Sequence, residues 1–327
     1  MRSANQHSAI MRFALAACLS TSCVLAADAG YVLTSSTPST WTSVVTGGSW
    51  RWSHGAFILV DMVAPLTKTF TVVNRDGSIS STWNFSIPDT SQLWVFGYDR
   101  DPAGNLVAAG EAYSYDGKLA PFIAIKPAKS DEVQIIRTYP YWPALLAVAP
   151  DGTIWTAGDE MTYDRKSHGD GVNPNGDAIR HFDRTGKLLG SGVPGLTVRP
   201  VWRSHDGYLV ATSERVGWYS PINGPGTYVE LPASHPSDYK IYKGVGDEKG
   251  QADGFALTDS GKVFMTHYAQ YKQTTYLLDR ASGQWSEVSL PGGDPMMRLE
   301  GSEKETLVFE NPKGLVFYDM PQSLASR

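Results

Sequence analysis

Six polar residues occupy comparable places in the sequence, each at the end of a short apolar segment that is expected to form a strand. Five are carboxylates and the sixth is a histidine: Asp61, Glu111, Asp159, Glu214, His267 and Glu310. If these segments surround one axis, the side chains form a ring. Such a ring is suited to binding Ca²⁺ or another divalent cation, or to moving protons, because crowding raises the pKa of a carboxyl. Polar residues also end strands for structural reasons, so capping of backbone N–H groups and pairing with arginines remain alternatives.

Aromatic and cationic residues form the second candidate set. Tyr141 and Trp142 follow Pro140 at the start of an expected strand. Flat rings exposed there would stack on a sugar or an aromatic ligand, although packing between sheets is the alternative. Arg199 and Arg298 complete the predicted ligand-binding set, and their alternative role is pairing with the strand-end acids.

An oxygen-rich loop gives a separate candidate for calcium. Asp170, Asn173, Asn175 and Asp177 lie close together, with glycines that allow a tight wrap. Ca²⁺ prefers such oxygen ligands, but the spacing is not that of an EF-hand. A solvated loop built from Asx-turns has the same composition.

The elements that would position these residues recur along the chain. An apolar strand, a tight turn containing glycine and a second apolar strand appear four times, with the turn glycines at Gly104, Gly152, Gly207 and Gly261. Glycine suits such turns because it adopts positive φ without a steric cost. Each unit of 40 to 55 residues therefore predicts four antiparallel strands in a meander, which is typical of a β-propeller blade.

Six blades account for the length of the chain. They are expected at residues 41–88, 91–138, 142–192, 197–232, 250–290 and 295–320. The last contains three strands, and the N-terminal segment Tyr31-Val32-Leu33-Thr34 is expected to supply its fourth. The sequence thus predicts an all-β, six-bladed propeller of four-stranded antiparallel blades, closed by an N-terminal strand. The longest loops are those between second and third strands and between blades, so we expect the functional site on that face.

Residues 144–192 resemble an NHL-type repeat. The similarity lies in Leu-Ala-Val-Ala-Pro-Asp-Gly-Thr-Ile-Trp, followed by a polar loop and Ala-Ile-Arg-His-Phe-Asp-Arg-Thr-Gly-Lys-Leu-Leu. The wider group of six-bladed propellers includes gluconolactonase-like enzymes, which hold a divalent metal at the mouth of the channel, and many propellers that bind without catalysis. The resemblance implies the fold, whereas a fold alone does not choose a function.

The first 26 residues have the features of a secretory signal peptide. Arg2 and Arg12 precede a short apolar run, and small residues surround the expected cleavage after Ala26. The domain organisation is therefore a signal peptide at 1–26 and a propeller at 27–327, in a secreted or periplasmic protein. The alternative is a lipid anchor at Cys18, because Leu15-Ala16-Ala17-Cys18 resembles a lipobox. After Gly30 no apolar run is long enough to predict a transmembrane segment.

Composition and missing motifs narrow the function. The chain of 327 residues has a formal charge of −5 and lacks the basic patch expected of a nucleic-acid-binding protein. Walker, Rossmann, zincin and serine-hydrolase motifs are absent from the sequence. We therefore expect a binding module that recognises a small molecule, glycan or peptide at the channel mouth. A divalent-metal-dependent hydrolase or lactonase of the gluconolactonase type is the alternative, so the sequence leaves open whether the protein is an enzyme, as it does its oligomeric state.

Overall fold

The computed structural model describes residues 31–33, 48–61, 66–75, 78–164, 169–196, 198, 207–220, 226–245, 251–288, 297–311 and 314–319. The predicted signal peptide at 1–26, Cys18 and Arg199 lie outside these residues. The regular elements of the described residues are all β-strands. None of the described segments is a helix of the length and apolar character that a membrane span requires.

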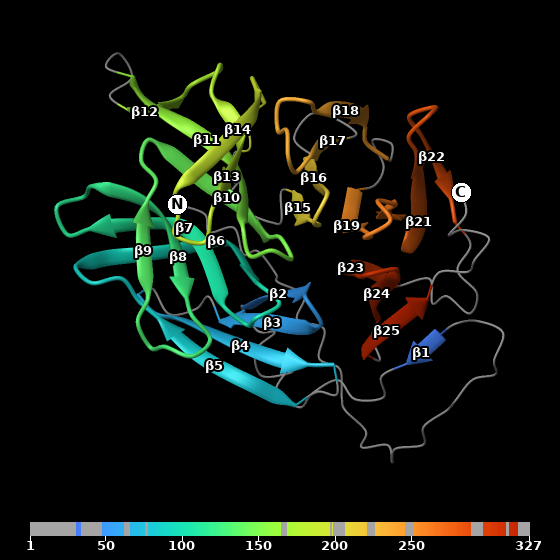
Figure 1. Cartoon of the computed structure of the whole chain (residues 1–327), viewed down its shortest axis with the longest axis horizontal. Coiled ribbons are helices and arrows are strands. Elements are labelled where there is room, and N and C mark those ends of the chain that lie inside the picture. Colours follow the sequence, from blue (N-terminus) through green and yellow to red (C-terminus); the bar gives the residue numbers. More distant parts are fainter. Residues whose placement is uncertain are drawn as a thin grey trace, which may run out of the picture.

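The strands form six antiparallel sheets, which follow one another along the chain and surround a common centre (Figure 1). The first three sheets comprise β2 (Gly48–Ser53), β3 (Ala56–Asp61), β4 (Lys68–Asn74) and β5 (Ile79–Phe85); β6 (Thr90–Arg100), β7 (Leu106–Ser114), β8 (Leu119–Lys126) and β9 (Gln134–Arg137); and β10 (Tyr141–Val148), β11 (Ile154–Asp164), β13 (Asp177–Phe182) and β14 (Leu188–Pro194). A short strand, β12 (Gly169–Val172), pairs with the far end of β11 and extends this third sheet.

The other three sheets repeat the same order. They comprise β15 (Tyr208–Ala211), β16 (Arg215–Ser220), β17 (Thr227–Pro232) and β18 (Lys240–Lys243); β19 (Gln251–Leu257), β20 (Val263–Ala269), β21 (Lys272–Asp279) and β22 (Gln284–Glu287); and β23 (Arg298–Glu303), β24 (Thr306–Asn311), β25 (Gly314–Asp319) and β1 (Tyr31–Leu33). In the sixth sheet β1 pairs antiparallel with β25, with Val32 opposite Phe317. The outermost strand of this sheet thus comes from the N-terminal part of the chain.

The apolar side chains of each strand alternate between two neighbouring sheets. In β3, Ala56, Ile58 and Val60 pack in one apolar group with residues of the second sheet. The intervening Phe57 and Leu59 pack with residues of the sixth sheet. Successive side chains of a strand point to opposite faces, so one buried strand joins two interfaces. This is why the strands read as continuous apolar runs in the sequence.

Six apolar groups join the sheets in a closed order. They lie between sheets one and two, two and three, three and four, four and five, five and six, and six and one. Burial of apolar surface at about 25 cal/mol per Å² makes these interfaces the main source of stability. Six sheets packed face to face in a ring are a six-bladed β-propeller, as the sequence predicted. The first strands of the blades are β2, β6, β10, β15, β19 and β23 and surround the central channel.

The fourth blade differs from the prediction. The sequence predicted it at 197–232, with Gly207 in its first turn and Tyr208–Val210 in its second strand. In the structure β15 is the first strand, since it pairs with β16 and leads the order β15-β16-β17-β18. Gly207 directly precedes this first strand, so the sequence motif was assigned one strand too late; the first strand predicted before Asp206 lies outside the described residues. Glu214 therefore lies in the exposed first-to-second turn, where its carbonyl accepts a hydrogen bond from the N–H of Ala233 at 2.8 Å.

Four of the first strands carry a β-bulge at a similar depth. The pairing with the second strand skips one residue in each: Phe96 in β6, Ala144 in β10, Asp253 in β19 and Glu300 in β23. A bulge breaks the alternation of the strand and re-aims a side chain. In the fifth and sixth blades the residue at the bulge is an acid.

Candidate functional site

A cavity of about 430 Å³ occupies the central channel. All six first strands contribute to its wall. It extends to the first-to-second turns, where His54, Pro102 and Lys304 line it. The cavity therefore reaches the face opposite the one that loop length favoured in the sequence. Its wall contains two groups of charged side chains, one held by blades one to four and one by blades five and six, and Asp259, Glu303 and Lys304 line it as well.

On one side, Arg51 of β2 crosses between blades. Its guanidinium donates hydrogen bonds to the backbone carbonyls of Tyr98 in blade two (3.3 Å), Leu146 in blade three and Leu209 in blade four (2.8 Å). It also pairs with the carboxylate of Asp99 at 3.4 Å. Asp99 is buried and in turn accepts hydrogen bonds from the hydroxyl of Ser53 and from the N–H of Val148. These contacts hold four first strands together. The charge of Arg51 is balanced within the protein by Asp99.

On the other side, Arg298 lies between two glutamates. Its Nη2 is 2.6 Å from Oε1 of Glu300 and 2.9 Å from Oε2 of Glu310. Glu310 is placed there by the strand register, since it lies directly opposite Arg298 in the pairing of β24 with β23. Glu300 is placed there by the bulge. The guanidinium also lies over the ring of Trp50 from blade one, at 5.2 Å from its centroid.

Asp253 of the neighbouring fifth blade completes this second group, which we call the channel cluster: Asp253, Arg298, Glu300 and Glu310. The first three line the cavity, while Glu310 lies behind Arg298. Gln273 donates a hydrogen bond to Oδ2 of Asp253. Oδ1 is buried and has no hydrogen-bond partner among the described residues. Two carboxyl groups thus contact the guanidinium of Arg298, and a third, that of Asp253, lies within its electrostatic influence.

Burial and crowding shift two acids of the channel cluster, Asp253 and Glu310, toward the neutral form. Burial raises the pKa of Glu310 to about 7, the carboxyl of Glu300 raises it as well, and Arg298 acts in the opposite direction. Burial likewise raises the pKa of Asp253 to about 6, although Thr266 and Arg298 lower it. A carboxyl group near neutral pKa can bind a cation when ionised or donate a proton when neutral. The cluster is therefore able to do either.

Of the predicted ring, Glu310 is the acid that joins the channel cluster. Asp61 ends β3 and is exposed. Glu111 is buried in β7, and burial raises its pKa to about 7 while Tyr113 lowers it. Asp159 is buried in β11 and accepts a hydrogen bond from the N–H of Val198 at 2.9 Å, between the third and fourth blades. The structure thus distributes these acids among separate places instead of bringing them together.

The side chain of His267 does not point toward the central channel, as the predicted ring of six residues requires. The preceding residue, Thr266, accepts a hydrogen bond from the N–H of Leu299 at 3.2 Å and so faces the sixth blade. Successive side chains alternate, so His267 faces the other side of its sheet. It is buried, and its Nε2 has no hydrogen-bond partner among the described residues.

The two aromatic residues predicted as a ligand platform differ in exposure. Tyr141 is completely buried, its hydroxyl lies 3.0 Å from that of Thr156, and the guanidinium of Arg180 covers its ring at 4.1 Å. It belongs to the packing of blade three, so the prediction of an exposed ring at Tyr141 is wrong. Trp142 is half-buried, and its ring meets that of Phe96 edge to face at 5.6 Å.

The described residues do not fit a resident metal ion. They contain no group of three or more His, Cys, Asp or Glu side chains arranged to hold one. Two residues of the oxygen-rich loop use side-chain oxygens internally: Asn173 accepts a hydrogen bond from the N–H of Asn175 at 3.0 Å, and Asp177 accepts one from the hydroxyl of Ser191 at 2.6 Å. The side chain of Asp170 lies outside those that the structure describes. These contacts correspond to the turn-rich alternative. We therefore derive no step through a metal.

Asp253 and Glu300 were missed in the sequence because they lie inside first strands, whereas the predicted ring drew on the ends of second strands. Each is followed by a glycine, and the structure explains why only glycine fits at that position. A Cβ on Gly254 would lie 2.2 Å from the carbonyl oxygen of Leu299, and Gly301 has a φ of +153°. An acid followed by glycine within an expected first strand is the signal that would have found both.

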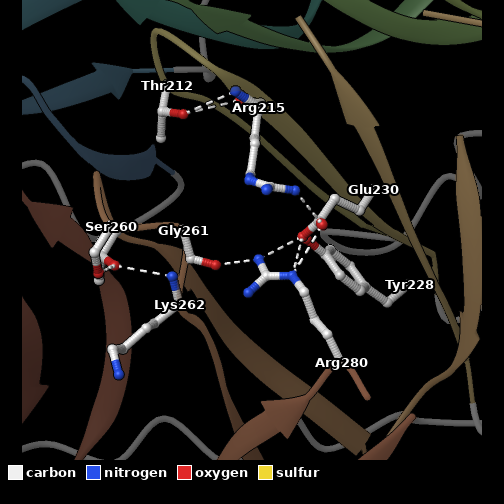
Figure 2. A network of polar contacts seen from close by, with 9 residues as sticks. Thr212, Arg215, Tyr228, Glu230, Ser260, Gly261, Lys262 and Arg280 are labelled. Carbon is white, nitrogen blue, oxygen red and sulfur yellow. Dashed lines mark hydrogen bonds and ion pairs between the residues drawn. The ribbon is translucent and has the colours of Figure 1, made fainter. Parts of the chain in front are cut away.

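A third group of charges, centred on the buried carboxylate of Glu230, lies away from the channel between blades four and five (Figure 2). Glu230 of β17 has a side chain that is only 4% exposed and accepts hydrogen bonds from Arg215, Arg280 and the hydroxyl of Tyr228, at 2.8, 2.6 and 2.9 Å. Arg280 also donates to the carbonyl of Gly261. Burial alone would lower the pKa of Arg280, but its bonds to Glu230 raise it. We call Arg215, Tyr228, Glu230 and Arg280 the seam network.

Comparisons with known proteins show similarity in fold. No protein-family model and no curated protein matches the sequence. Among solved structures, the chain is similar to a gluconolactonase from Xanthomonas campestris, with 14% identity over 90% of this chain and 96% of the other, at a TM-score of 0.46. It is also similar to a putative exported protein from Bacteroides fragilis, with 10% identity over 85% and 91% and a TM-score of 0.48.

TolB from Acinetobacter baumannii is a third similar structure, with 13% identity over 81% of this chain and 63% of the other, at a TM-score of 0.43. The likeness to all three is one of fold. The three are unlike proteins by name, and at this distance they carry no argument about what the channel does.

Proposed function

We propose that the protein is a binding propeller that holds a small polar molecule in its central channel. The observation that carries this proposal is the cavity of about 430 Å³ whose wall includes Asp253, Arg298 and Glu300. A few polar groups converging on a concave site of this size are typical of small-molecule sites. Buried charges that serve only stability would not need an open space beside them.

A library of metabolites screened by thermal shift tests this proposal. A molecule that binds the folded state raises the melting temperature as its concentration increases. A crystal structure with a hit should place it against the channel cluster. A hit seated on the outer wall, with the channel unchanged, would contradict the proposal.

A hydrolase is the second candidate, and the carboxyls of Asp253 and Glu300 in the cavity wall favour it. A group with a pKa of about 6, as burial gives Asp253, suits general acid–base catalysis near neutral pH. Assays of lactone and ester hydrolysis at pH 7 test this candidate. Loss of turnover in an Asp253→Asn variant that melts normally would support it, and turnover that persists in this variant would exclude Asp253 from the reaction.

We also propose that the protein is exported, on the basis of the charged, apolar and small-residue segments of residues 1–26. Expression of the full chain in a bacterial host, followed by fractionation and mass spectrometry of the mature N-terminus, tests this. Cleavage near Ala26 is the expected result. A lipid-modified N-terminus at Cys18 would support the alternative, and an intact chain in the cytoplasm would overturn both.

A further inference from the structure

We propose that the molecule held in the channel carries a cationic nitrogen, which binds against the carboxylates of Asp253 and Glu300. This inference rests on the proposed function, because it names the chemistry of the ligand at the same site. Three features support it: the balance of charge, an unused acceptor and the aromatic wall.

The balance of charge around the cavity favours a cation. The channel cluster has three carboxyl groups and one guanidinium, and both glutamates already contact Arg298. Asp253 accepts a hydrogen bond from the amide of Gln273, which brings no charge. When all three acids are ionised the cluster has a surplus of negative charge in a partly dry environment. A cation in the cavity would offset this repulsion, and the low local dielectric would strengthen the attraction.

An unused acceptor lies at the same place. Oδ1 of Asp253 is buried without a hydrogen-bond partner among the described residues. A buried acceptor without a donor costs about 1–3 kcal/mol. An ammonium group supplies three donors on a compact charge, so one group would satisfy this oxygen and reach a second carboxylate.

Aromatic rings line the cavity beside these acids. Trp50 and Phe96 contribute to the wall together with Tyr208, which is stacked near Phe255 with ring centroids 6.4 Å apart. The position of Arg298 over Trp50 shows that a cation is already accommodated on this ring face. Aromatic faces attract cations by about 0.5–2 kcal/mol and also accept the apolar body of an amine.

An anionic ligand fits less well, because the guanidinium groups that line the cavity are engaged. Arg51 bonds to three backbone carbonyls and Asp99, and Arg298 bonds to two glutamates. His54 contacts the carbonyl of Val148 at 2.9 Å. Lys304 lies in an exposed turn at the end of the cavity. A carboxylate placed against Arg51 or Arg298 would therefore have to displace an internal acid.

The test compares three probes of similar shape and different charge: phenethylammonium, 2-phenylethanol and 3-phenylpropionate. Affinity is measured by calorimetry at low salt and at pH 8, which is above the raised pKa values of Asp253 and Glu310. We expect phenethylammonium to bind at least tenfold more tightly than the other two. Asp253→Asn should reduce its affinity about tenfold, and Glu300→Gln serves as the second variant if Asp253→Asn folds poorly. Asp238→Asn, which changes an exposed aspartate outside the cavity, is the matched control and should leave the affinity unchanged.

Each outcome decides the proposal. Equal binding of phenethylammonium and 2-phenylethanol would overturn the cationic preference but leave the channel as a small-molecule site. Tighter binding of 3-phenylpropionate would also overturn it. The preference is equally overturned if phenethylammonium fails to bind at millimolar concentration, or if its affinity is unchanged in a folded Asp253→Asn protein. Failure of the proposed function is distinguished by the metabolite screen, in which the hits would then lie outside the channel.

Discussion

The seam network and the channel cluster are made of the same chemical groups in opposite proportions. In the seam network, two guanidinium groups and a phenol serve the single carboxylate of Glu230. In the channel cluster, two carboxyls contact the single guanidinium of Arg298 and a third lies within its electrostatic influence. The first arrangement is complete and joins two blades. The second is incomplete and lies beside an open cavity. Buried charged side chains occur in both groups. A structural group is distinguished from a candidate site by whether partners within the protein balance those charges.

The largest expected effect comes from breaking the seam network. Glu230→Gln would remove the buried counter-charge of Arg215 and Arg280, whose side chains are 42% and 30% exposed, and the loss of their charged hydrogen bonds costs about 3 kcal/mol. The free energy of unfolding, measured in urea, should fall by that amount. Glu310→Gln is the matched control: Arg298 keeps Glu300, and burial raises the pKa of Glu310 to about 7, so removal of this charge should not lower the free energy of unfolding at pH 8. Equal losses in the two variants would remove the distinction between the groups.

A buried carboxyl away from both groups should behave like the acids of the channel cluster. Burial raises the pKa of Glu111 to about 7 from its usual 4.5. The folded state therefore binds more protons than the unfolded state between these values, and stability falls as the pH rises through this window. Glu111→Gln should stabilise the protein by about 3 kcal/mol at pH 8, and have little effect at pH 4. Exposed Glu132→Gln is the control, and a stabilisation of Glu111→Gln that is independent of pH would contradict this explanation.

Protonation of Asp253 and Glu310 should weaken the binding of a cationic ligand in the channel. The pKa of Asp253 is about 6 and that of Glu310 about 7, both raised by burial, so both acids lose their charge as the pH falls to 5. Phenethylammonium affinity should then decrease about tenfold between pH 8 and pH 5, which corresponds to about 1.4 kcal/mol. Calorimetry at both pH values checks this, with 2-phenylethanol as the probe that should not respond. Affinity that rises on acidification would count against the acids as the binding groups.

The smallest effect is expected at an exposed ion pair. Lys272 and Glu287 approach to 3.9 Å, and both side chains are more than half exposed. Such pairs contribute about 0–1 kcal/mol, because water and salt screen them. Lys272→Ala should therefore change the free energy of unfolding by less than about 1 kcal/mol, and added salt should abolish the change. A larger loss would show that the exposure of an ion pair does not predict its contribution to the stability of this protein.

The repeated blades could be predicted from local sequence, because each strand pair is marked by an apolar run and a turn glycine. Gly104, Gly152 and Gly261 all adopt positive φ, as such turns require. The fourth blade was misplaced because Asp206-Gly207 has the composition of a turn but precedes the first strand. A local motif does not state which pair of strands it joins. That information comes from pairing across the sheet.

The candidate site was predicted only in part for the same reason. Glu310 was identified because it stands at the end of a second strand, and Arg298 because it could bind a ligand or pair with such an acid. Asp253 and Glu300 lie at bulges, which depend on the register between two strands and leave a weak mark in sequence. The proposed ring assumed that equivalent residues converge on the axis. In the structure Asp159 contacts the chain between blades instead.

Arg51 makes the channel wall of blades one to four more rigid than that of blades five and six. Because one guanidinium bonds to the backbones of β6, β10 and β15, the wall formed by the first four blades has little freedom to widen without losing several hydrogen bonds together. The innermost strands of the fifth and sixth blades have no such tie to Arg51 among its described contacts. We expect these two blades to make the larger adjustments when a guest arrives, so that a molecule of variable length would be accommodated from one side of the ring.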